Sequence, residues 1–528
     1  MTLDRIVRRN ALRFPARTAL RTDTRSVTWQ QLDRRVDRIA HALHSRGLVA
    51  GDRVAMLLGN CAEIVELYFG VARAGLIAVP LNWRLTNDEL SRLLCQAEPA
   101  LLVIGAPFVE PFRETLASGA SPSRRWIVGT GLPGAEQYEQ VVEQARDVAL
   151  ESKASEDEPF AIFFTSGTTG LPKGAMVSHR NLVANAFNQF VADGSRPNDV
   201  NLVATPLYHM GAVFMAVTYM MLGCTQVVLD KFDPQAWLDA LARHRASVSL
   251  LVPTMINAVV NHPAIGKADL ASLRCLFYGG GPMPPKVLRR AMQTLPCGFT
   301  QGYGLTETLE ATFLVAADHV LDGDEHQQRR LASAGREAVG AEVRIAVADG
   351  RDAAPFEVGE ILVRSESVIP GYWRMPEETA LAIRDGWFHT GDLGYLDDER
   401  YLFVVDRIKD MVVTGGVNVY TKEVEAVLFE HPAVLEAAVL GLPDDQWGEI
   451  VVAAVVLRPG HTVSAGLLAE HCRQSLAGFK KPRVIHFLDE LPRNPSGKIL
   501  KRELRRQLSG RADARPAPEA SSPTSLRS

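Results

Sequence analysis

The chain contains 528 residues, of which 47% are hydrophobic and 22% are charged. A chain of this length exceeds the size of one ordinary hydrophobic core, so we expect two or more domains. Its 57 basic and 61 acidic residues nearly balance, which argues against a general attraction to nucleic acid or to an anionic membrane.

The N-terminal ten residues carry several charges and no apolar stretch follows them, so we find no signal peptide. The six cysteines are scattered and form no Cys-x-x-Cys pair. Such a pattern is typical of reduced thiols rather than of a disulfide framework. The sequence therefore favours a cytoplasmic protein.

Short apolar runs alternate with amphipathic stretches between residues 50 and 305. Residues 101–104 and 248–252 are typical of buried strands, and residues 235–243 and 284–295 of helices. This alternation predicts a large, layered α/β domain with mostly buried sheets.

One loop in this region has the composition of a phosphate-binding loop. Residues 164–174 read Phe-Thr-Ser-Gly-Thr-Thr-Gly-Leu-Pro-Lys-Gly, between an apolar strand and a helix expected to begin near Asn181. The glycines let backbone N–H groups approach an anion, the hydroxyls donate hydrogen bonds, and Lys173 adds charge. The loop lacks the Gly-Lys-Ser/Thr ending of a Walker A loop. A Ser/Thr/Gly-rich linker is the alternative, but a nucleoside triphosphate site explains Lys173 and the apolar flanks better.

Residues 211–229 contain no charged residue and approach the length of a membrane-spanning helix. Gly223 and Thr225 interrupt this run, so a buried helix followed by a buried strand is the better interpretation. We do not expect the chain to span a membrane, while contact with a membrane surface stays open. His209 precedes the run, and a lone histidine at such a place is more often structural than functional.

Two glycine-containing turns follow predicted strands. Gly279, Gly280 and Gly281 come after the strand at 273–278, where bare backbone suits a flat base, although a tight turn explains them equally well. Residues 301–307 read Gln-Gly-Tyr-Gly-Leu-Thr-Glu and end another strand. Tyr303 could stack on adenine and Glu307 could bind Mg²⁺, with a solvated loop acid as the alternative for Glu307.

Strand-like pieces at 343–347, 359–363 and 401–405 predict a small β subdomain. Asp392, directly after Gly391, suits the two vicinal hydroxyls of a ribose. Residues 406–410 then place four charges beside an apolar strand. A hinge, an interdomain contact and a solvated charged face are all compatible with this run.

About a hundred residues after Arg407 have mixed helix and strand patterns and predict a small α+β domain. Near its end, Lys498 lies on a turn stiffened by proline and glycine, which suits a positioned charge, although most surface lysines are merely solvated. From Gly510 onward Ala, Pro, Ser and Arg dominate. The predicted boundaries are an N-terminal domain at 1–406, a C-terminal domain at 407–508, and a disordered tail at 509–528.

Taken together, these stretches resemble the adenylate-forming superfamily of acyl-CoA synthetases, adenylation domains and luciferases, from near the N-terminus to about Arg505. The chain looks most like bacterial acyl-CoA synthetases that act on fatty or aromatic acids. The resemblance implies a small C-terminal domain that rotates about a hinge between two half-reactions. A carboxylate first attacks the α-phosphate of ATP, giving acyl-AMP and pyrophosphate, and the thiol of CoA then displaces AMP. ATP, Mg²⁺ and CoA are the implied cofactors and co-substrates.

The resemblance also assigns roles to single residues. It implies that the β- and γ-phosphates are held by Thr165, Ser166, Gly167, Thr168, Thr169, Gly170 and Lys173. It implies an adenine site lined by Gly279, Gly280, Gly281 and Tyr303, with Gly302 and Gly304 also among the nucleotide-binding residues. The other nucleotide assignments are Mg²⁺ for Thr165 and Glu307, the α-phosphate for Thr306, the ribose for Asp392 and Arg407, and the hinge for Lys409.

Further assignments concern the acid and CoA. Lys498 matches the lysine that bridges the carboxylate and the α-phosphate, where an ammonium group stabilises the moving charge. His209 matches an aromatic or histidine gate beside the acyl pocket. The resemblance implies that pantetheine passes Gly415 and Gly416, and that the rest of CoA meets Phe479, Lys481 and Arg483.

Two residues depart from the family pattern. Val417 stands where many relatives have glutamate, and Thr421 replaces a frequent proline; both lie near the implied thioester-forming face. We therefore expect a carboxylate–CoA ligase, with an adenylating ligase that loads a carrier protein as the alternative. A nucleotide-binding regulator without turnover is a third reading, but the presence of Lys498 and Glu307 argues against it.

The expected acyl pocket takes residues from 185–190, 209–215, 278–281, Leu305 and 310–313. Its lipophilic side chains include Phe187, Met210, Phe214 and Met215. These segments hold no unmatched Arg or Lys, so we do not expect a second carboxylate on the substrate. The sequence favours a medium- or long-chain fatty acid over an aryl or cinnamic-type acid, and it leaves a homodimer open.

Overall fold

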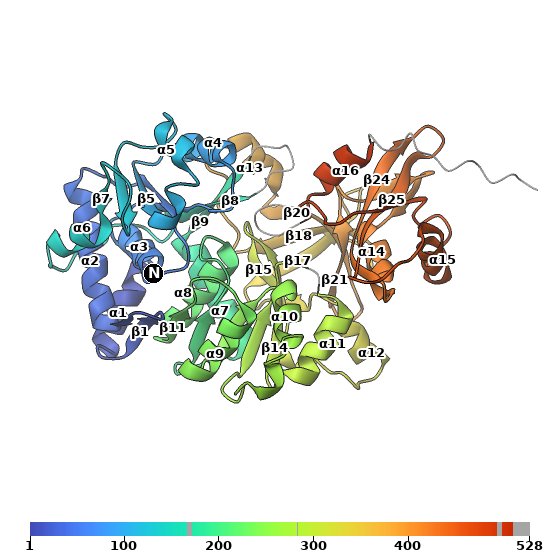
Figure 1. Ribbon diagram of the computed structural model, residues 1–528, viewed down its shortest axis with the longest axis horizontal. Helices are drawn as coiled ribbons and strands as arrows, with labels where there is room; N and C mark the ends of the chain where they lie inside the picture. Colours follow the sequence, from blue (N-terminus) through green and yellow to red (C-terminus); the bar gives the residue numbers. More distant parts are fainter. Residues whose placement is uncertain (166–171, 282, 494–498, 510–528) are drawn as a thin grey trace, which may run out of the picture. The chain divides into compact units, whose positions relative to one another are not determined.

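The computed structural model describes residues 1–165, 172–281, 283–493 and 499–509 (Figure 1). Two compact units make up the chain. The first is formed by Met1–Thr390 and Gly394–Val404, and the second by Gly391–Leu393 and Val405–Ser528. The expected disordered tail lies outside the described residues, except for Ser509, which ends the last helix. That Gly391–Leu393 joins the second unit is a feature that no sequence pattern indicated.

The first unit contains a seven-stranded sheet with strand order β7-β6-β5-β3-β4-β8-β9. Its neighbours are parallel except for the pair β8 and β9. The strands are β3 (Arg53–Leu57), β4 (Ile77–Pro80), β5 (Leu101–Gly105), β6 (Arg125–Val128), β7 (Glu136–Gln137), β8 (Pro159–Thr165) and β9 (Lys173–Ser178). The N-terminal helices are α1 (Asp4–Arg13), α2 (Trp29–Ser45), α3 (Ala62–Arg73), α4 (Asn87–Ala97), α5 (Arg113–Ala117) and α6 (Tyr138–Gln144).

A nine-stranded sheet follows, with order β16-β15-β14-β13-β12-β10-β11-β1-β2. Its strands are β1 (Thr18–Arg21), β2 (Ser26–Thr28), β10 (Val200–Val203), β11 (Thr225–Val228), β12 (Val248–Leu251), β13 (Cys275–Tyr278), β14 (Gly298–Leu305), β15 (Leu309–Leu314) and β16 (Arg336–Glu337). The pairs β14–β15, β15–β16 and β1–β2 are antiparallel. The neighbouring helices are α7 (His179–Asp193), α8 (Met210–Met221), α9 (Pro234–His244), α10 (Pro253–Val260), α11 (Pro285–Thr294) and α12 (Glu325–Arg330).

Alternate residues of this sheet face two separate cores, as the period of a strand requires. Phe277 points into the core that contains α7 and α8, whereas its neighbours Leu276 and Tyr278 point into the core that contains α9, α10 and α11. Both faces are therefore buried, which explains why the strands read as continuous apolar runs. The layered α/β prediction is confirmed.

The predicted β subdomain is confirmed. Its five-stranded sheet has the strand order β17-β18-β20-β19, and β21 also pairs with β20. Its elements are β17 (Ala341–Ala346), β18 (Gly359–Ser365), α13 (Pro376–Ala382), β19 (Ile383–Arg384), β20 (Trp387–Leu396) and β21 (Leu402–Arg407).

The second unit is built around the sheet β23-β22-β25-β24, with β26 parallel to β25. Its elements are β22 (Val412–Thr414), β23 (Val417–Val419), α14 (Thr421–Glu430), β24 (Val434–Asp444), β25 (Gly448–Leu457), α15 (Ala465–Ser475), β26 (Val484–Phe487) and α16 (Lys501–Ser509). One face of the sheet packs on α14 and α15 and the other on α16. This is the α+β domain that the sequence predicts.

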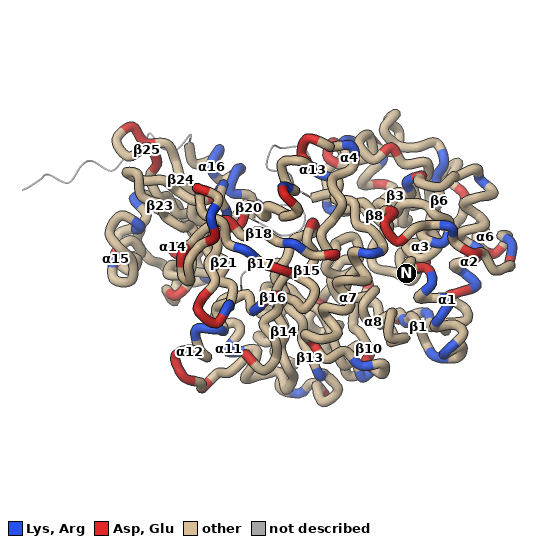
Figure 2. The backbone as a smooth tube through the Cα atoms, turned by 180° about the vertical axis from the view of Figure 1, so that it is seen from behind, with Lys and Arg blue, Asp and Glu red and all other residues tan. Residues whose placement is uncertain are grey.

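The uncharged run at 211–229 folds as the buried helix α8 followed by the strand β11. Within the described ranges, no helix is long and apolar enough to cross a membrane. Figure 2 shows acidic and basic residues interspersed along the chain, in keeping with its nearly balanced composition.

Candidate active site

Thr165 and Lys173 flank the predicted phosphate-binding loop. Thr165 ends β8, Lys173 begins β9, and the two residues are paired across the antiparallel strands. The other predicted loop residues, Ser166, Gly167, Thr168, Thr169 and Gly170, lie outside the described residues.

The expected direct step from this loop to a helix is wrong, because β9 intervenes before α7 begins at His179. Gly174 permits the close pairing of the hairpin, since a Cβ there would lie 2.9 Å from a methyl carbon of Ile162. The two ends of the loop, Thr165 and Lys173, are therefore held by paired strands.

Glu307 lies in the turn between β14 and β15 and accepts two hydrogen bonds at one carboxylate oxygen. Thr165 Oγ1 donates to Glu307 Oε1 at 3.2 Å, and the Tyr372 hydroxyl donates to the same oxygen at 3.0 Å. Burial and the neighbouring Glu307 raise the pKa of Tyr372, so its hydroxyl keeps its proton. The backbone N–H of Ile369 donates to the Glu307 carbonyl at 2.9 Å. The two residues predicted to serve Mg²⁺ are thus in direct contact.

Tyr372 is a site residue that the sequence reasoning missed. It lies in the irregular segment between β18 and α13, where no motif drew attention to it. The Lys173 ammonium group lies 5.1 Å from the centre of the Tyr372 ring and forms an ion pair with Glu378 of α13. Lys173 and the turn at Glu307 therefore both contact the Tyr372 side chain.

The predicted adenine glycines lie where three strands approach closely. A Cβ on Gly279 would come within 2.8 Å of the Gly302 carbonyl oxygen, and one on Gly304 within 1.6 Å of the Leu309 carbonyl oxygen. Gly280 has a φ of +75°, and Gly281 is exposed. Strand packing therefore requires Gly279 and Gly304 whatever they bind.

Tyr303 and Thr306 lie on the same strand and turn as Glu307. The Tyr303 ring is partly buried and packs against the core of the β subdomain. Thr306 is half-buried directly before Glu307. Both residues thus lie close along the chain to the Glu307 carboxylate.

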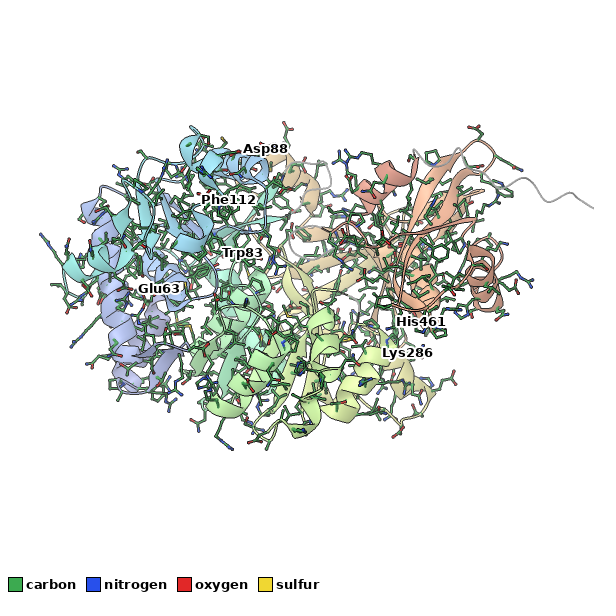
Figure 3. All side chains as sticks on the ribbon, in the orientation of Figure 1. Glu63, Trp83, Asp88, Phe112, Lys286 and His461 are labelled. Carbon is green, nitrogen blue, oxygen red and sulfur yellow. The ribbon has the colours of Figure 1, made fainter. Side chains whose placement is uncertain are left out.

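His209 is half-buried and directly precedes α8, and the burial of its ring lowers the pKa to about 4. Its ring centre lies 4.5 Å from that of Tyr208, which in turn packs edge-on against Trp83 at 6.1 Å. Trp83 is labelled in Figure 3. Phe214 and Met215 of α8 are buried, as expected for an acyl pocket, whereas Phe187 is 58% exposed. The neutral imidazole is therefore part of an aromatic cluster.

Asp392 and Arg407 are brought together within the second unit. Arg407 Nε lies 2.9 Å from Asp392 Oδ1, and Asp392 is 4% exposed. The Ile408 N–H donates to the Gly391 carbonyl at 3.0 Å, which ties the two segments together. Lys409, the predicted hinge residue, is exposed in the turn between β21 and β22.

Gly415 and Gly416 form the turn between β22 and β23 with φ values of +58° and +80°. A Cβ on Gly415 would lie 2.9 Å from the Trp447 ring, and the Arg483 guanidinium lies 4.3 Å from the centre of that ring. Trp447 was missed because it stands in a loop without a recognisable motif.

Two further predicted CoA contacts lie nearby along the chain. Phe479 is 46% exposed, and Lys481 is half-buried. Lys498, the predicted catalytic lysine, lies outside the described residues.

Of the two departures from the family pattern, Val417 is 44% exposed and Thr421 is buried. The Thr421 hydroxyl donates to Asp406 Oδ2 at 2.9 Å and accepts from Lys501 Nζ at 2.6 Å. Its backbone N–H also donates to Asp406, a bond that proline could not make. Thr421 is thus a structural link between β21, α14 and α16.

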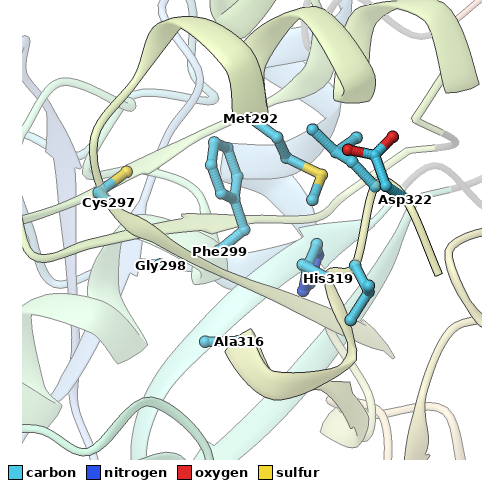
Figure 4. A pocket seen from close by; sticks show the side chains of 9 residues that line it. Met292, Cys297, Gly298, Phe299, Ala316, His319 and Asp322 are labelled. Carbon is cyan, nitrogen blue, oxygen red and sulfur yellow. The ribbon is translucent and has the colours of Figure 1, made fainter. Parts of the chain in front are cut away.

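A cavity of about 460 Å³ lies elsewhere in the first unit (Figure 4). Its lining residues are Met292, Cys297, Gly298, Phe299, Ala316, His319, Val320, Leu321 and Asp322. It contains none of the predicted site residues. The candidate site is therefore defined by the contacts among Thr165, Glu307 and Tyr372, and this cavity is not part of it.

Comparisons with known proteins identify the family of the chain. The AMP-binding enzyme family matches residues 7–373, and the AMP-binding enzyme C-terminal domain matches residues 423–498. A feruloyl-CoA synthase from Amycolatopsis sp. is 38% identical over 94% of this chain and 97% of its own length. The fatty acid–[acyl-carrier-protein] ligase ScoC from Streptomyces coeruleorubidus is 37% identical over 94% of both chains.

Among solved structures, the amide bond synthetase McbA from Marinactinospora thermotolerans superimposes with a TM-score of 0.86 and 30% identity. The match covers 96% of this chain and 99% of that one. The chain therefore belongs to the AMP-binding enzyme family and is an AMP-forming acid–thiol ligase.

Proposed function

We propose that the chain activates a lipophilic carboxylic acid as its acyl-AMP and transfers the acyl group to CoA, releasing pyrophosphate and AMP. The observation that carries this proposal is the hydrogen bond between Thr165 and Glu307 beside the two ends of the phosphate-binding loop. This contact joins a hydroxyl and a carboxylate, the oxygen donors that Mg²⁺ takes together with phosphate oxygens.

The donor set therefore fits Mg²⁺, which neutralises charge on the phosphates when it is bound. Thr165 and Glu307 would hold it, and Tyr372 keeps the Glu307 carboxylate in place through its hydrogen bond. Among the described residues, no group of three or more His, Cys, Asp and Glu side chains suits a metal ion. A magnesium ion that shares its ligands with phosphate needs only one or two carboxylates.

Lys173 supplies positive charge for the β- and γ-phosphates. In this structure the ammonium group is paired with Glu378, so binding of ATP would exchange a carboxylate for phosphate oxygens. The Asp392 carboxylate, held by Arg407, would accept hydrogen bonds from the ribose hydroxyls. Lys498 would lie between the substrate carboxylate and the α-phosphate, where an ammonium group stabilises the charge that develops.

The acyl group would lie against α8. Eleven of its twelve residues are buried and none is charged, which suits an apolar acyl group. The preference for a medium- or long-chain fatty acid stays a prediction, with an aryl or cinnamic-type acid as the alternative. The relatives named above include ligases for both kinds of acid.

The acceptor is the second open choice. CoA is favoured by Gly415 and Gly416, the pair that the family resemblance assigns to the passage of pantetheine and that forms a turn with φ values of +58° and +80°. A carrier protein is the alternative, because ScoC is a fatty acid–[acyl-carrier-protein] ligase by name.

The test is mass spectrometry of the purified full chain with ATP, Mg²⁺, CoA and a pool of fatty and aryl acids. We expect acyl-CoA and AMP as products. Acyl-AMP without acyl-CoA would support the carrier protein as acceptor. No adenylate and no thioester from any acid would contradict the proposed function.

A further inference from the structure

Glu310 has a buried carboxyl oxygen for which the described residues supply no partner. It is the second residue of β15 and is 9% exposed, and its Oε2 atom forms no hydrogen bond within the described part of the chain. Burial raises its pKa to about 8, and no neighbouring charge contributes to this shift. Buried polar groups without partners are rare in folded proteins, so this carboxyl group requires an explanation.

The carboxyl group occupies the space that a side chain at residue 302 would fill. A Cβ on Gly302 would lie 2.3 Å from Glu310 Oε2 and 2.6 Å from Phe277 Cζ. Phe277 faces the core between the sheet and the helices α7 and α8. Glu310 therefore points to the α8 side of the sheet, where the acyl group is proposed to lie.

The side chain that contacts the Glu310 backbone, Asn185, carries an unpartnered hydrogen-bond donor among the described residues. Asn185 of α7 accepts a hydrogen bond at Oδ1 from the Glu310 N–H at 3.0 Å. This bond fixes the orientation of the amide, and its Nδ2 atom is buried without a partner among the described residues. A buried polar group that is left unsatisfied destabilises the fold, so two such groups on residues joined by a hydrogen bond are better explained by a ligand that pairs with them.

The chemistry of the two groups selects the ligand. A hydroxyl group donates one hydrogen bond and accepts others, so it satisfies the Glu310 oxygen and the Asn185 amide together. An ammonium group would leave the amide unpaired, and a plain alkyl chain would satisfy neither group.

Aromatic side chains surround this place. Phe277 packs edge-on against Phe214 at 5.8 Å and against Phe313 at 6.2 Å. Such edge-to-face contacts are the arrangement that aromatic rings prefer, and a further ring can join them. The surroundings therefore suit the hydroxyl of an aryl group better than that of a flexible chain.

We propose that Glu310 and Asn185 together bind the hydroxyl group of a hydroxylated aryl acid, which makes a phenolic acid the preferred substrate. The inference rests on the proposed function, since it names the acid that the same site activates. It reverses the preference for a fatty acid that the sequence suggests.

The test compares two acids that differ only in the hydroxyl group, 4-hydroxycinnamate and cinnamate, with octanoate as the aliphatic reference. We expect wild-type kcat/KM for acyl-CoA formation to favour 4-hydroxycinnamate about 100-fold over cinnamate, because a site built for a hydroxyl rejects the analogue that lacks it. The Glu310→Leu variant should bring this ratio close to one, and Glu310→Gln should give an intermediate ratio. Glu143→Gln, at an exposed position of α6, is the matched control and should keep the wild-type ratio.

The outcomes separate the two proposals. Adenylate or thioester formation from cinnamate or octanoate, with no preference for 4-hydroxycinnamate, would overturn the inference and leave the proposed function intact. No product from any acid would overturn the proposed function itself. If Glu310→Leu does not fold, as judged by its Tm, the wild-type ratio alone decides.

Discussion

Two glutamates that stand three residues apart have opposite surroundings. Glu307 lies at the end of the sheet, where two hydroxyl groups donate to one of its oxygens. Glu310 lies in the interior, beside Phe277, and the described residues leave its Oε2 atom without a partner. Hydroxyl groups of the chain orient the first carboxylate, which is proposed to act at the phosphates, whereas the second is proposed to bind a group of the substrate. Two acids close together in one strand pair can therefore bind different partners, here the metal at the phosphates and a group of the substrate.

Loss of the Glu307 carboxylate should have the largest effect. Glu307→Gln is expected to slow acyl-AMP formation about 1000-fold, because it removes the charge that would hold the metal at the phosphates. ATP–pyrophosphate exchange measures this step without the CoA reaction. The control is Glu325→Gln at an exposed position of α12, which should exchange like the wild type. Exchange within twofold of the wild type in Glu307→Gln would contradict the role of this carboxylate.

Tyr372→Phe tests whether the orientation of the Glu307 carboxylate matters, because it removes one hydrogen-bond donor to Glu307 and keeps the ring. A hydrogen bond to a charged group is typically worth enough for about a tenfold effect, so we expect a tenfold slower exchange. The concentration of Mg²⁺ needed for half-maximal rate should rise as well. An unchanged magnesium dependence would mean that Tyr372 does not position Glu307.

Glu310→Leu tests the other glutamate through stability. Its carboxyl titrates near pH 8 in the folded chain, against an ordinary value of 4.5. Between these values the folded state holds a proton that the unfolded state has lost, so stability falls as pH rises and levels off above pH 8. The variant lacks this slope and should gain about 2 kcal/mol at neutral pH by losing an unpartnered buried carboxyl. Parallel Tm–pH curves for the two proteins would contradict this prediction.

The smallest expected effect concerns Asp406 in the second unit. Unlike Glu310, this buried acid accepts hydrogen bonds at both carboxylate oxygens. Thr421→Val removes the hydroxyl that donates to Asp406 and keeps the backbone donor. We expect a loss of about 1 kcal/mol in the free energy of unfolding. Chemical denaturation measures it, and Val417→Thr, at an exposed position, is a control that should change little.

The layers of the fold could be predicted from sequence because strands buried on both faces produce continuous apolar runs. The helix and the strand at 211–229 could be separated because Gly223 interrupts the apolar run between them. The strand β9 was missed, since it follows a glycine-rich loop and begins with a lysine. Its pairing with β8 depends on a long-range contact that local pattern does not reveal.

The site was predictable where motifs carry the chemistry, as for Thr165 and Glu307. Tyr372 was not, because its role depends on the chain folding back from the segment after β18. Nor could the sequence indicate that Glu310 lacks a partner. An acid within an apolar strand is commonly paired, and only the folded structure shows that Glu310 Oε2 has no partner among the described residues.

The most direct test of the account measures kcat/KM for acyl-AMP formation from 4-hydroxycinnamate and cinnamate in three proteins: the wild type, Glu307→Gln and Glu310→Leu. The account predicts that Glu307→Gln lowers both values by the same factor and keeps the ratio between the acids. It predicts that Glu310→Leu lowers the value for the hydroxylated acid alone and brings the ratio close to one. The same pattern in both variants, or an unchanged ratio in Glu310→Leu, would contradict it.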